Sequence, residues 1–113
     1  MSARILPTQS VEKVWGRTHL PEPFSSPDGQ RIGEIWFEPP AELDQLLVKF
    51  LFTSEKLSVQ CHPSDEQARE GEQGKEECWL VLDAEPDARI AIGLKKPADA
   101  DTLRAAAQDG SIE

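Results

Sequence analysis

Apolar and polar side chains alternate most clearly over residues 57–63, which read LSVQCHP in one-letter code. Successive side chains of an extended chain point to opposite faces. The alternation therefore places Ser58, Gln60 and His62 on one face of a strand and the apolar residues on the other. Pro63 disfavours a helical backbone at His62, which keeps this residue extended. Three polar side chains in register on an otherwise apolar strand indicate that this face lines a site.

Other short segments also have the composition of strands, being rich in branched and aromatic residues: 32–37, 46–52, 75–82 and 89–93. Turn signals separate them at residues 25–29 and 84–87. The segment 46–52 is apolar on both faces, as expected of a strand buried between two layers. Prolines crowd the first forty residues and argue against a long helix there.

Two helices are predicted among these strands. Ser64 followed three residues later by Gln67 resembles a capping box and predicts a short helix over residues 65–70. The Ala-rich tail, residues 98–108, predicts a second helix, with Asp99 or Asp101 as N-cap and Gly110 as its stop. Short strands, turns and two small helices together favour an all-β antiparallel sandwich or barrel.

Length and composition predict one soluble globular domain spanning residues 1–113, with 38% hydrophobic and 29% charged residues. The formal net charge of −9 argues against nucleic acid and anionic membranes as partners. A phosphate-bearing substrate would need local positive groups, for which Arg31, Lys49 and Lys75 are candidates. The first residues lack the apolar core of a secretory signal, and no apolar run is long enough to cross a bilayer, so we expect a cytoplasmic location.

Cysteine and histidine usage narrows the candidate chemistry. Cys61 and Cys78 form neither a disulfide framework nor a CxxC pair, and we expect both to pack as small apolar residues. His19 lies in a polar, turn-like stretch without a partner motif and is expected to be an ordinary surface residue.

A metal site is the interpretation that the polar face of residues 57–63 favours. Glu77 lies on a second predicted strand, two residues after Lys75, and could complete the group formed by Gln60 and His62. An amide oxygen, an imidazole nitrogen and a carboxylate are plausible ligands of a divalent metal such as zinc. Lys75 suits a phosphate as a flexible point charge. As an exposed lysine beside acidic residues, it would equally need no function.

Five short motifs resemble those of the type I mannose-6-phosphate isomerases, in the family's order and spacing. They lie at residues 14–16, 32–36, 46–52, 57–63 and 74–79. The Ser-x-Gln-x-His-Pro and Gly-Lys-x-Glu-x-Trp motifs together are the most specific of them. The resemblance covers the N-terminal portion of the family and implies a cupin fold, here a jelly-roll sandwich or partial barrel. It also implies a zinc cofactor and a phosphosugar substrate, mannose 6-phosphate or fructose 6-phosphate.

The resemblance also implies roles for single residues. Gln60, His62 and Glu77 resemble three of the family's four zinc ligands, whereas Ser58 and Lys75 resemble residues that face the phosphosugar. Trp15 and Glu34 match positions near the family's active-site region without an assigned chemical step. The fourth zinc ligand, a histidine, and a catalytic arginine belong to a later segment of the family's barrel. Because Gln60 is a neutral, weak ligand and His62 is the one imidazole of the predicted site, we expect this chain to bind metal weakly.

Three functions remain open from the sequence. The first is aldose–ketose isomerisation, in which a metal polarises the sugar carbonyl and a positioned group moves a proton; the sequence does not identify that acid or base. The second is a non-catalytic cupin-like module that binds a sugar or a metal. The third is a structural β-module that oligomerises. Half a barrel would leave unpaired strand edges, so we also expect a homodimer that shares sheets.

Overall fold

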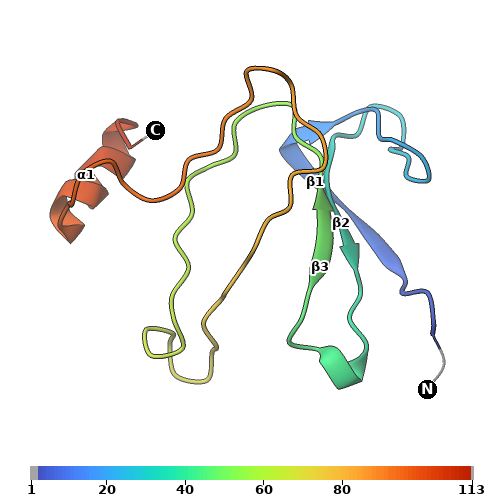
Figure 1. The fold of residues 1–113 in the computed structure, drawn as a ribbon, viewed down its shortest axis with the longest axis horizontal. Coiled ribbons are helices and arrows are strands. Elements are labelled where there is room, and N and C mark those ends of the chain that lie inside the picture. The colour runs from blue at the N-terminus through green and yellow to red at the C-terminus, as the bar shows by residue number, and fades with distance from the viewer. Residues whose placement is uncertain (1–2, 113) are drawn as a thin grey trace. The chain divides into compact units, whose positions relative to one another are not determined.

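The computed structural model describes residues 3–112, which form two compact units that divide between Ser58 and Val59. The first unit contains the strands β1 (Thr8–Arg17), β2 (Ile32–Phe37) and β3 (Val48–Leu51), and a short 3-10 helix, η1 (Ala41–Leu43), that connects β2 to β3. The second unit contains the helix α1 (Ala100–Asp109). Figure 1 shows the three strands side by side and η1 at the end of the hairpin.

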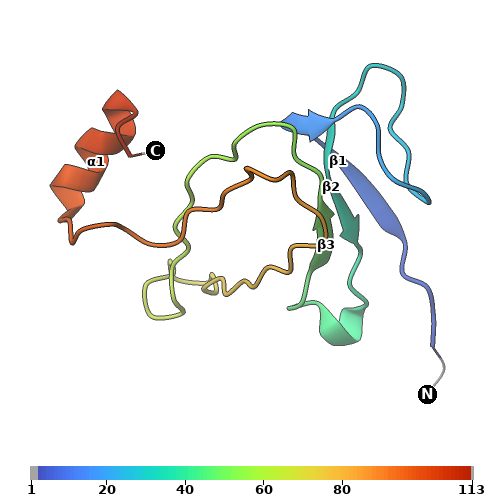
Figure 2. The same ribbon diagram turned by 45° about the horizontal axis from the view of Figure 1, so that its top comes forward.

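The three strands form one open antiparallel sheet in the order β1-β2-β3. The view in Figure 2 shows β2 between its two neighbours. Being central, β2 is the buried strand, and Ile32 and Ile35 are its fully covered apolar side chains, at 1% and 2% exposure. The expected strand at residues 32–37 is therefore confirmed with the same bounds.

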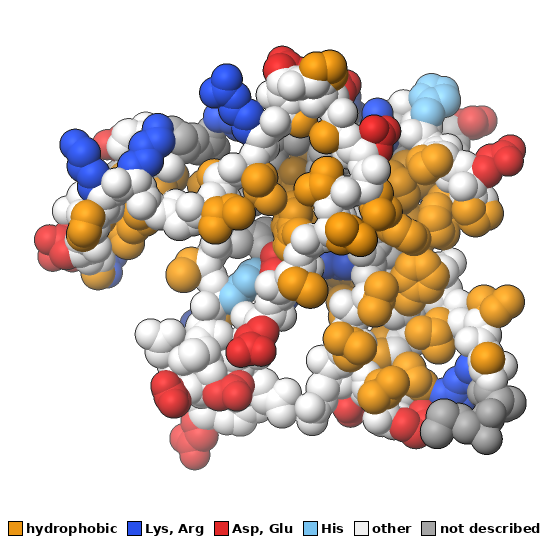
Figure 3. Space-filling model, in the orientation of Figure 1, with side chains coloured by type: hydrophobic (Ala, Val, Ile, Leu, Met, Phe, Trp, Pro, Cys, Tyr) orange, Lys and Arg blue, Asp and Glu red, His pale blue; other side chains and the backbone are white. Residues whose placement is uncertain are grey.

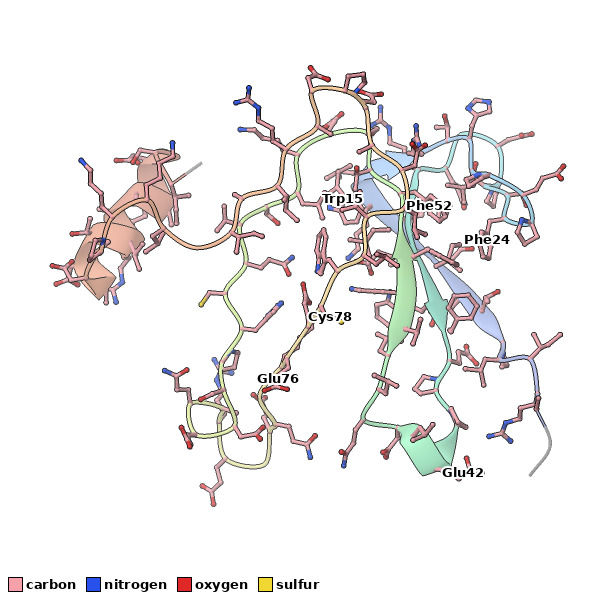
Figure 4. All side chains as sticks on the ribbon, viewed as in Figure 1. Trp15, Phe24, Glu42, Phe52, Glu76 and Cys78 are labelled. Carbon is pink, nitrogen blue, oxygen red and sulfur yellow. The ribbon has the colours of Figure 1, made fainter. Side chains whose placement is uncertain are left out.

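A cluster of phenylalanine rings covers part of this sheet. Phe50 lies 5.5 Å from Phe24 and 5.7 Å from Phe37 between ring centroids, and Phe24 lies 6.1 Å from Phe52. Figure 4 labels Phe24 and Phe52 beside the sheet. Tilted aromatic pairs at these separations stabilise a core beyond their buried area. The cluster fixes the loop that carries Phe24 against β2 and β3.

The register of β1 on β2 contains a pronounced bulge. Both Glu12 and Arg17 pair with Ile32, so the residues between them leave the regular ladder. Gly16 is needed within this bulge, because a Cβ there would lie 2.6 Å from the backbone nitrogen of Gly33. Bulges bend a strand and re-aim its side chains. Here the bulge sends the chain after Gly16 away from the sheet, into the loop that precedes β2.

Two expectations for the first unit need correction. The strand predicted at residues 46–52 exists only as β3, and the prediction that it is buried on both faces is wrong: Leu46, Leu47 and Val48 are all exposed. No second layer covers them among residues 3–112. Strand β1 was not predicted, because most of its residues are polar and only Gly16 is buried.

The second unit forms fewer regular elements than its sequence predicts. Within the described residues, 57–62, 75–82 and 89–93 join no strand ladder, so the strands predicted there are wrong in this structure. Their side chains are mostly exposed, Leu80 and Ile92 to 83% and 87%. A strand needs backbone partners as well as suitable residues. The turn predicted at 84–87 is confirmed, with the Ala88 amide donating to the Glu85 carbonyl at 3.0 Å.

The capping box at Ser64 forms without the helix that it predicted. The Ser64 amide donates to the Gln67 side chain at 3.3 Å, and the Ala68 amide donates to the Ser64 carbonyl at 2.9 Å. The chain then leaves the helical path, so the predicted helix at residues 65–70 is limited to one turn. A single turn fixes several dihedral angles for few hydrogen bonds, and this segment has no apolar face to offset that cost.

The C-terminal helix is confirmed with both of its caps. The Asp99 side chain accepts from the Thr102 amide at 2.8 Å, which makes it the N-cap. Gly110 ends α1 in the left-handed region, at φ 79°. Cys61 and Cys78, in contrast, are exposed free thiols, so the prediction that they pack in a core is wrong. The extended segments that carry them lack a covering layer within the described part of the chain.

At the level of fold class, the structure is an open antiparallel sheet followed by a C-terminal helix, in agreement with the expected all-β class. Closure into a jelly roll stays a prediction. No helix formed by residues 3–112 has the length and apolar character needed to cross a membrane.

Candidate functional site

The segments that carry the predicted metal ligands are joined within the second unit. The Lys75 amide donates to the Pro63 carbonyl at 3.0 Å, and the Gly74 amide donates to the Asp65 side chain at 2.9 Å. Glycine is required at position 74, because a Cβ would lie 2.4 Å from the backbone of Ser64. These contacts close the loop between the two segments and bring the residues after Gly74 beside His62.

The carboxylate of Glu77 is the centre of this arrangement. Its Oε2 lies 3.3 Å from His62 Nε2 and 3.5 Å from Lys75 Nζ. Its Oε1 accepts a hydrogen bond of 2.6 Å from the indole nitrogen of Trp79. Three different nitrogen groups therefore share one carboxylate. The side chains of His62 and Glu77 are 25% and 31% exposed, so solvent and small ligands can reach them.

These neighbours favour the ionised form of Glu77. The hydrogen bond from Trp79 is the main cause that lowers the pKa of Glu77, and the charges of Lys75 and His62 lower it further. Partial burial raises the pKa of this carboxyl but does not offset the other effects. An ionised carboxylate is the form that binds a metal or accepts a hydrogen bond.

The geometry of His62 and Glu77 fits two ligands of one zinc ion. Zinc bonds to nitrogen and oxygen at about 2.0–2.2 Å in a tetrahedron, which puts the two ligand atoms about 3.4 Å apart. The observed separation of 3.3 Å is close to this value. Within residues 3–112, however, no three His, Cys, Asp or Glu side chains gather as a metal-binding group. A third ligand would have to be of another kind, such as the predicted Gln60.

The other two predicted site residues take no part in this cluster. Gln60 is exposed and makes no side-chain hydrogen bond to another described residue, so its role as a ligand stays a prediction. Ser58 is also exposed and is the last residue of the first unit. Its expected position facing a phosphosugar stays a prediction as well.

The loop between His62 and Lys75 is acidic. It contains Asp65, Glu66, Glu70 and Glu72 against the single base Arg69. Figure 3 shows acidic side chains gathered over this loop. A negative potential at this end of the second unit favours a cation and disfavours a phosphate. The surroundings of Glu77 therefore suit a metal ion better than an anion.

One feature of the site, the hydrogen bond from Trp79 to Glu77, was not found by sequence reasoning. Trp79 was read only as part of a motif, although the Glu-x-Trp spacing puts both side chains on the same face of an extended segment. Glu76 and Cys78, labelled in Figure 4, occupy the alternate positions of this segment. The signal for the indole–carboxylate hydrogen bond was therefore present in the two-residue step.

A second carboxylate with the same kind of neighbours lies in the first unit. Glu34 on β2 is 6% exposed, accepts from Trp36 Nε1 at 2.7 Å and from Lys49 Nζ at 3.1 Å. Burial is the largest single effect on the pKa of Glu34 and raises it, but Trp36, Lys49 and Lys13 together lower this pKa below its usual value. The sequence marked Glu34 as a matched position without a role. The structure makes it the anion of a buried ion pair.

Comparison with known proteins gives relatives of a single kind. The chain is 36% identical to the probable mannose-6-phosphate isomerase GmuF of Bacillus subtilis over 75% of its own length and 24% of that protein. It is 30% identical to the mannose-6-phosphate isomerase ManA of the same organism, over 73% of this chain and 38% of that protein. A mannose-6-phosphate isomerase of Streptococcus mutans is 40% identical over 53% of this chain and 20% of that protein.

The chain thus spans between 20% and 38% of the length of the curated relatives that it matches. No family model matches it, and no solved structure matches it. The resemblance expected from the five motifs is confirmed by these relatives.

Proposed function

Because this chain is similar to a part of several mannose-6-phosphate isomerases, we propose that it forms part of a zinc-dependent aldose–ketose isomerase. The proposed substrates are mannose 6-phosphate and fructose 6-phosphate. The observation that carries the proposal is the sharing of the Glu77 carboxylate by His62 and Lys75, at 3.3 and 3.5 Å. These residues come from the two motifs that resemble the family most specifically.

In this proposal His62 and Glu77 would hold the zinc ion, with the exposed Gln60 as a third ligand. A bound zinc ion polarises the sugar carbonyl and stabilises the negative charge that develops on its oxygen. Trp79 keeps Oε1 of Glu77 occupied, which leaves Oε2 as the ligand atom. Residues that hydrogen-bond a metal ligand orient it and commonly affect metal affinity about 10- to 100-fold.

Lys75 has a separate part in the proposed reaction. Its ammonium lies 3.5 Å from Glu77 and is half exposed. A lysine in this position can donate hydrogen bonds to a sugar oxygen beside the metal, and it must give up its contact with Glu77 Oε2 when a cation binds there. The residue that carries the proton between C1 and C2 is not assigned. Within the same proposal, the three-stranded sheet is part of a cupin jelly roll.

Zinc binding gives a direct test, because the chain contains a matched pair of histidines. We expect zinc to bind the chain weakly, and His62→Ala to abolish binding measured by calorimetry on chelator-treated protein. His19→Ala is the control, since His19 is exposed and hydrogen-bonds only Thr18 among the described residues. Binding that survives His62→Ala, or that is lost equally in both variants, would refute the proposed site.

Turnover is tested separately from metal binding. Conversion of mannose 6-phosphate by zinc-loaded protein, abolished by His62→Ala and by Glu77→Gln but kept in Glu38→Gln at an exposed glutamate after β2, is the result expected of an isomerase. Zinc binding without any conversion by a chain continued to the full length of its relatives would contradict catalysis. That outcome would favour the non-catalytic module instead.

A non-catalytic module that oligomerises is the second candidate, and one observation favours it. The second unit exposes a series of large apolar side chains: Val59, Trp79, Leu80, Val81, Leu82, Ile90, Ile92 and Leu94. Exposed apolar groups on this scale mark surfaces that proteins normally cover. We expect a homodimer at micromolar concentration by light scattering. A monomeric mass that stays constant on dilution would contradict this second candidate.

A further inference from the structure

A cavity of about 260 Å³ lies on the first unit, at the end of the sheet where β1 leaves its regular register. Four of its lining residues lie within the bulge in β1 or directly after it, one precedes β2 and one follows β3. They are Gly16, Arg17, Thr18, His19, Arg31 and Ser54. None of them belongs to the Glu77 cluster, so the cavity requires a separate explanation.

The floor of the cavity is held by hydrogen bonds between distant segments. The Ser54 amide donates to the Trp15 carbonyl at 2.8 Å, and the Ser54 hydroxyl donates to the Gly16 carbonyl at 2.8 Å. Gly16 itself lies against the backbone of β2, with no room for a Cβ. The hydroxyl of Ser26 donates to the Thr18 carbonyl, which ties down the loop beyond the bulge. The lining is therefore preorganised by the sheet.

Arg31 is fixed through one end of its guanidinium. Its Nη1 donates to the Val14 carbonyl at 3.2 Å, to the Ser54 hydroxyl at 3.4 Å and to Glu55 Oε1 at 3.2 Å. Its backbone is held too, because its carbonyl accepts from the Lys13 amide at 3.0 Å. The guanidinium has five N–H donors in a rigid fork. Its Nη2 and Nε hydrogens are not used by any described residue and stay available to a ligand.

Arg17, Thr18 and His19 supply further donors. Arg17 is exposed and forms no ion pair with another described residue. The Thr18 hydroxyl and His19 Nδ1 are 3.1 Å apart and bond each other, which leaves His19 Nε2 without a described partner. The Arg31 guanidinium is thus surrounded by a second guanidinium, an imidazole nitrogen and two hydroxyls.

The charge of this lining is opposite to that of the chain. The sequence contains 21 acidic and 12 basic residues, yet two of the six lining residues are arginines and none is acidic. Glu55 offsets part of the charge of Arg31 but does not line the cavity. In an acidic protein, a preorganised group of this kind creates a local attraction for anions.

We propose that this cavity binds a small oxyanion, namely a phosphate monoester or free phosphate. Paired guanidinium groups match the geometry of phosphate oxygens, and the bonded pair of Thr18 and His19 keeps one further donor, the hydroxyl or the Nε2–H according to the histidine tautomer. The volume exceeds what one tetrahedral anion fills, which leaves space for a group attached to the phosphate. The proposal does not depend on the isomerase function, because it uses none of the Glu77 cluster.

Titration with inorganic phosphate at constant ionic strength, followed by amide NMR, tests the site. We expect saturable shifts confined to residues 16–19, 31 and 54, with a dissociation constant of about 1–10 mM for two solvent-exposed guanidinium groups. Mannose 6-phosphate and mannose are titrated in parallel to separate phosphate from sugar. Shifts at the same amides with the phosphosugar, and none with mannose, support the assignment. Equal shifts with mannose overturn it.

Arg17→Gln is the decisive variant, since the backbone of Arg17 pairs with β2 but its side chain forms no hydrogen bond or ion pair with another described residue. We expect it to weaken phosphate binding roughly fivefold, the effect of losing one exposed charge-assisted hydrogen bond. Arg4→Gln is the control, because Arg4 is an exposed arginine that pairs with Glu42 away from the cavity. Unchanged affinity in Arg17→Gln, equal losses in both variants, or shifts that never saturate would each refute the site.

Discussion

The ion pair between Glu34 and Lys49 allows a quantitative test of what holds the sheet together. Glu34→Gln keeps the shape of the side chain and an oxygen that accepts from Trp36, but it removes the charge opposite Lys49. The ammonium lies 3.1 Å from Glu34, and the two side chains are 25% and 8% exposed. The substitution therefore leaves a largely covered cation without its anion.

The expected loss lies between two limits. Removing one partner of a fully buried pair costs about 3–5 kcal/mol, because an uncompensated charge is left behind. A fully exposed pair contributes at most about 1 kcal/mol. Since a quarter of Lys49 is exposed and water can solvate its ammonium, we expect Glu34→Gln to lower the free energy of unfolding by about 2 kcal/mol.

The same pair predicts how stability changes with pH. Burial raises the pKa of Glu34, but the hydrogen bonds from Trp36 and Lys49 and the nearby lysine charges lower the pKa below its unfolded value. A depressed folded pKa contributes stability above the unfolded pKa, about 4.3. This contribution is lost as the pH falls through the folded pKa. The wild-type chain should therefore lose its advantage over Glu34→Gln in acid.

Urea unfolding followed by tryptophan fluorescence, at neutral pH and at a series of acidic values, measures both effects. Glu38→Gln is the matched control, because Glu38 is an exposed glutamate directly after β2. The control should unfold like the wild type at neutral pH. Our reasoning is wrong if Glu34→Gln and Glu38→Gln unfold at the same urea concentration, or if the Glu34→Gln curve keeps the full acid dependence of the wild type.

Three further predictions concern local contacts. Gly16→Ala should lower the free energy of unfolding in urea by about 1–3 kcal/mol, because the added Cβ would lie 2.6 Å from the backbone of β2. The control Gly29→Ala, at φ 77° in open space, should lower it by only about 1 kcal/mol. A larger loss in Gly29→Ala than in Gly16→Ala would count against a tight bulge. Trp79→Phe should raise the pKa of Glu77 in metal-free protein, measured by carboxyl NMR, and an unchanged titration would show that the indole does not hold this carboxylate. Asp99→Ala should reduce the helix signal in circular dichroism whereas Asp99→Asn should keep it, and equal spectra would contradict the cap.

Local signals in the sequence predicted the elements that local chemistry controls. The helix α1 has its N-cap at Asp99 and its stop at Gly110, and both act within a single turn of the chain. Strand β2 combines branched and aromatic residues with burial on both sides, so its composition and its environment agree. Both elements could be predicted from the sequence without knowledge of distant contacts.

Elements that depend on a distant partner were predicted poorly, for two opposite reasons. Strand β1 is mostly polar and was not predicted, yet it pairs with β2 because a partner is available. Residues 79–82 and 89–93 have strong strand composition and form no ladder among the described residues. Side-chain alternation reports which residues suit a strand, but the ladder requires the backbone of a second segment.

The residues of the candidate sites also divide into those placed by local contacts and those placed by distant segments. His62, Lys75 and Glu77 come together because Gly74 and Asp65 close the loop between them, and the motif spacing anticipated this contact. The position of Gln60 depends on the path of an exposed segment, which alternation alone does not fix. The anion site required three segments whose approach is visible only in the folded sheet.

The two Glu-x-Trp motifs show how surroundings change the role of one local arrangement. At Glu34, Trp36 occupies one carboxylate oxygen at 2.7 Å and Lys49 occupies the other at 3.1 Å. The side chain is also buried, so both oxygens are committed to protein partners. A ligand could reach this carboxylate only by breaking the sheet. Glu34 is therefore best understood as a structural anion.

At Glu77 the same Glu-x-Trp spacing leaves the second carboxylate oxygen less firmly bound. Trp79 again occupies one oxygen, at 2.6 Å, but the other oxygen faces two nitrogen groups at the longer distances of 3.3 and 3.5 Å. These contacts are weaker than those at Glu34, and about a third of the side chain is exposed. In the proposed function a cation would displace Lys75 and take His62 as a second ligand, and neither residue lies in a strand. The second oxygen of Glu34 is held closely by Lys49, whereas that of Glu77 forms only longer contacts. Glu77, rather than Glu34, is therefore the carboxylate that a ligand can reach.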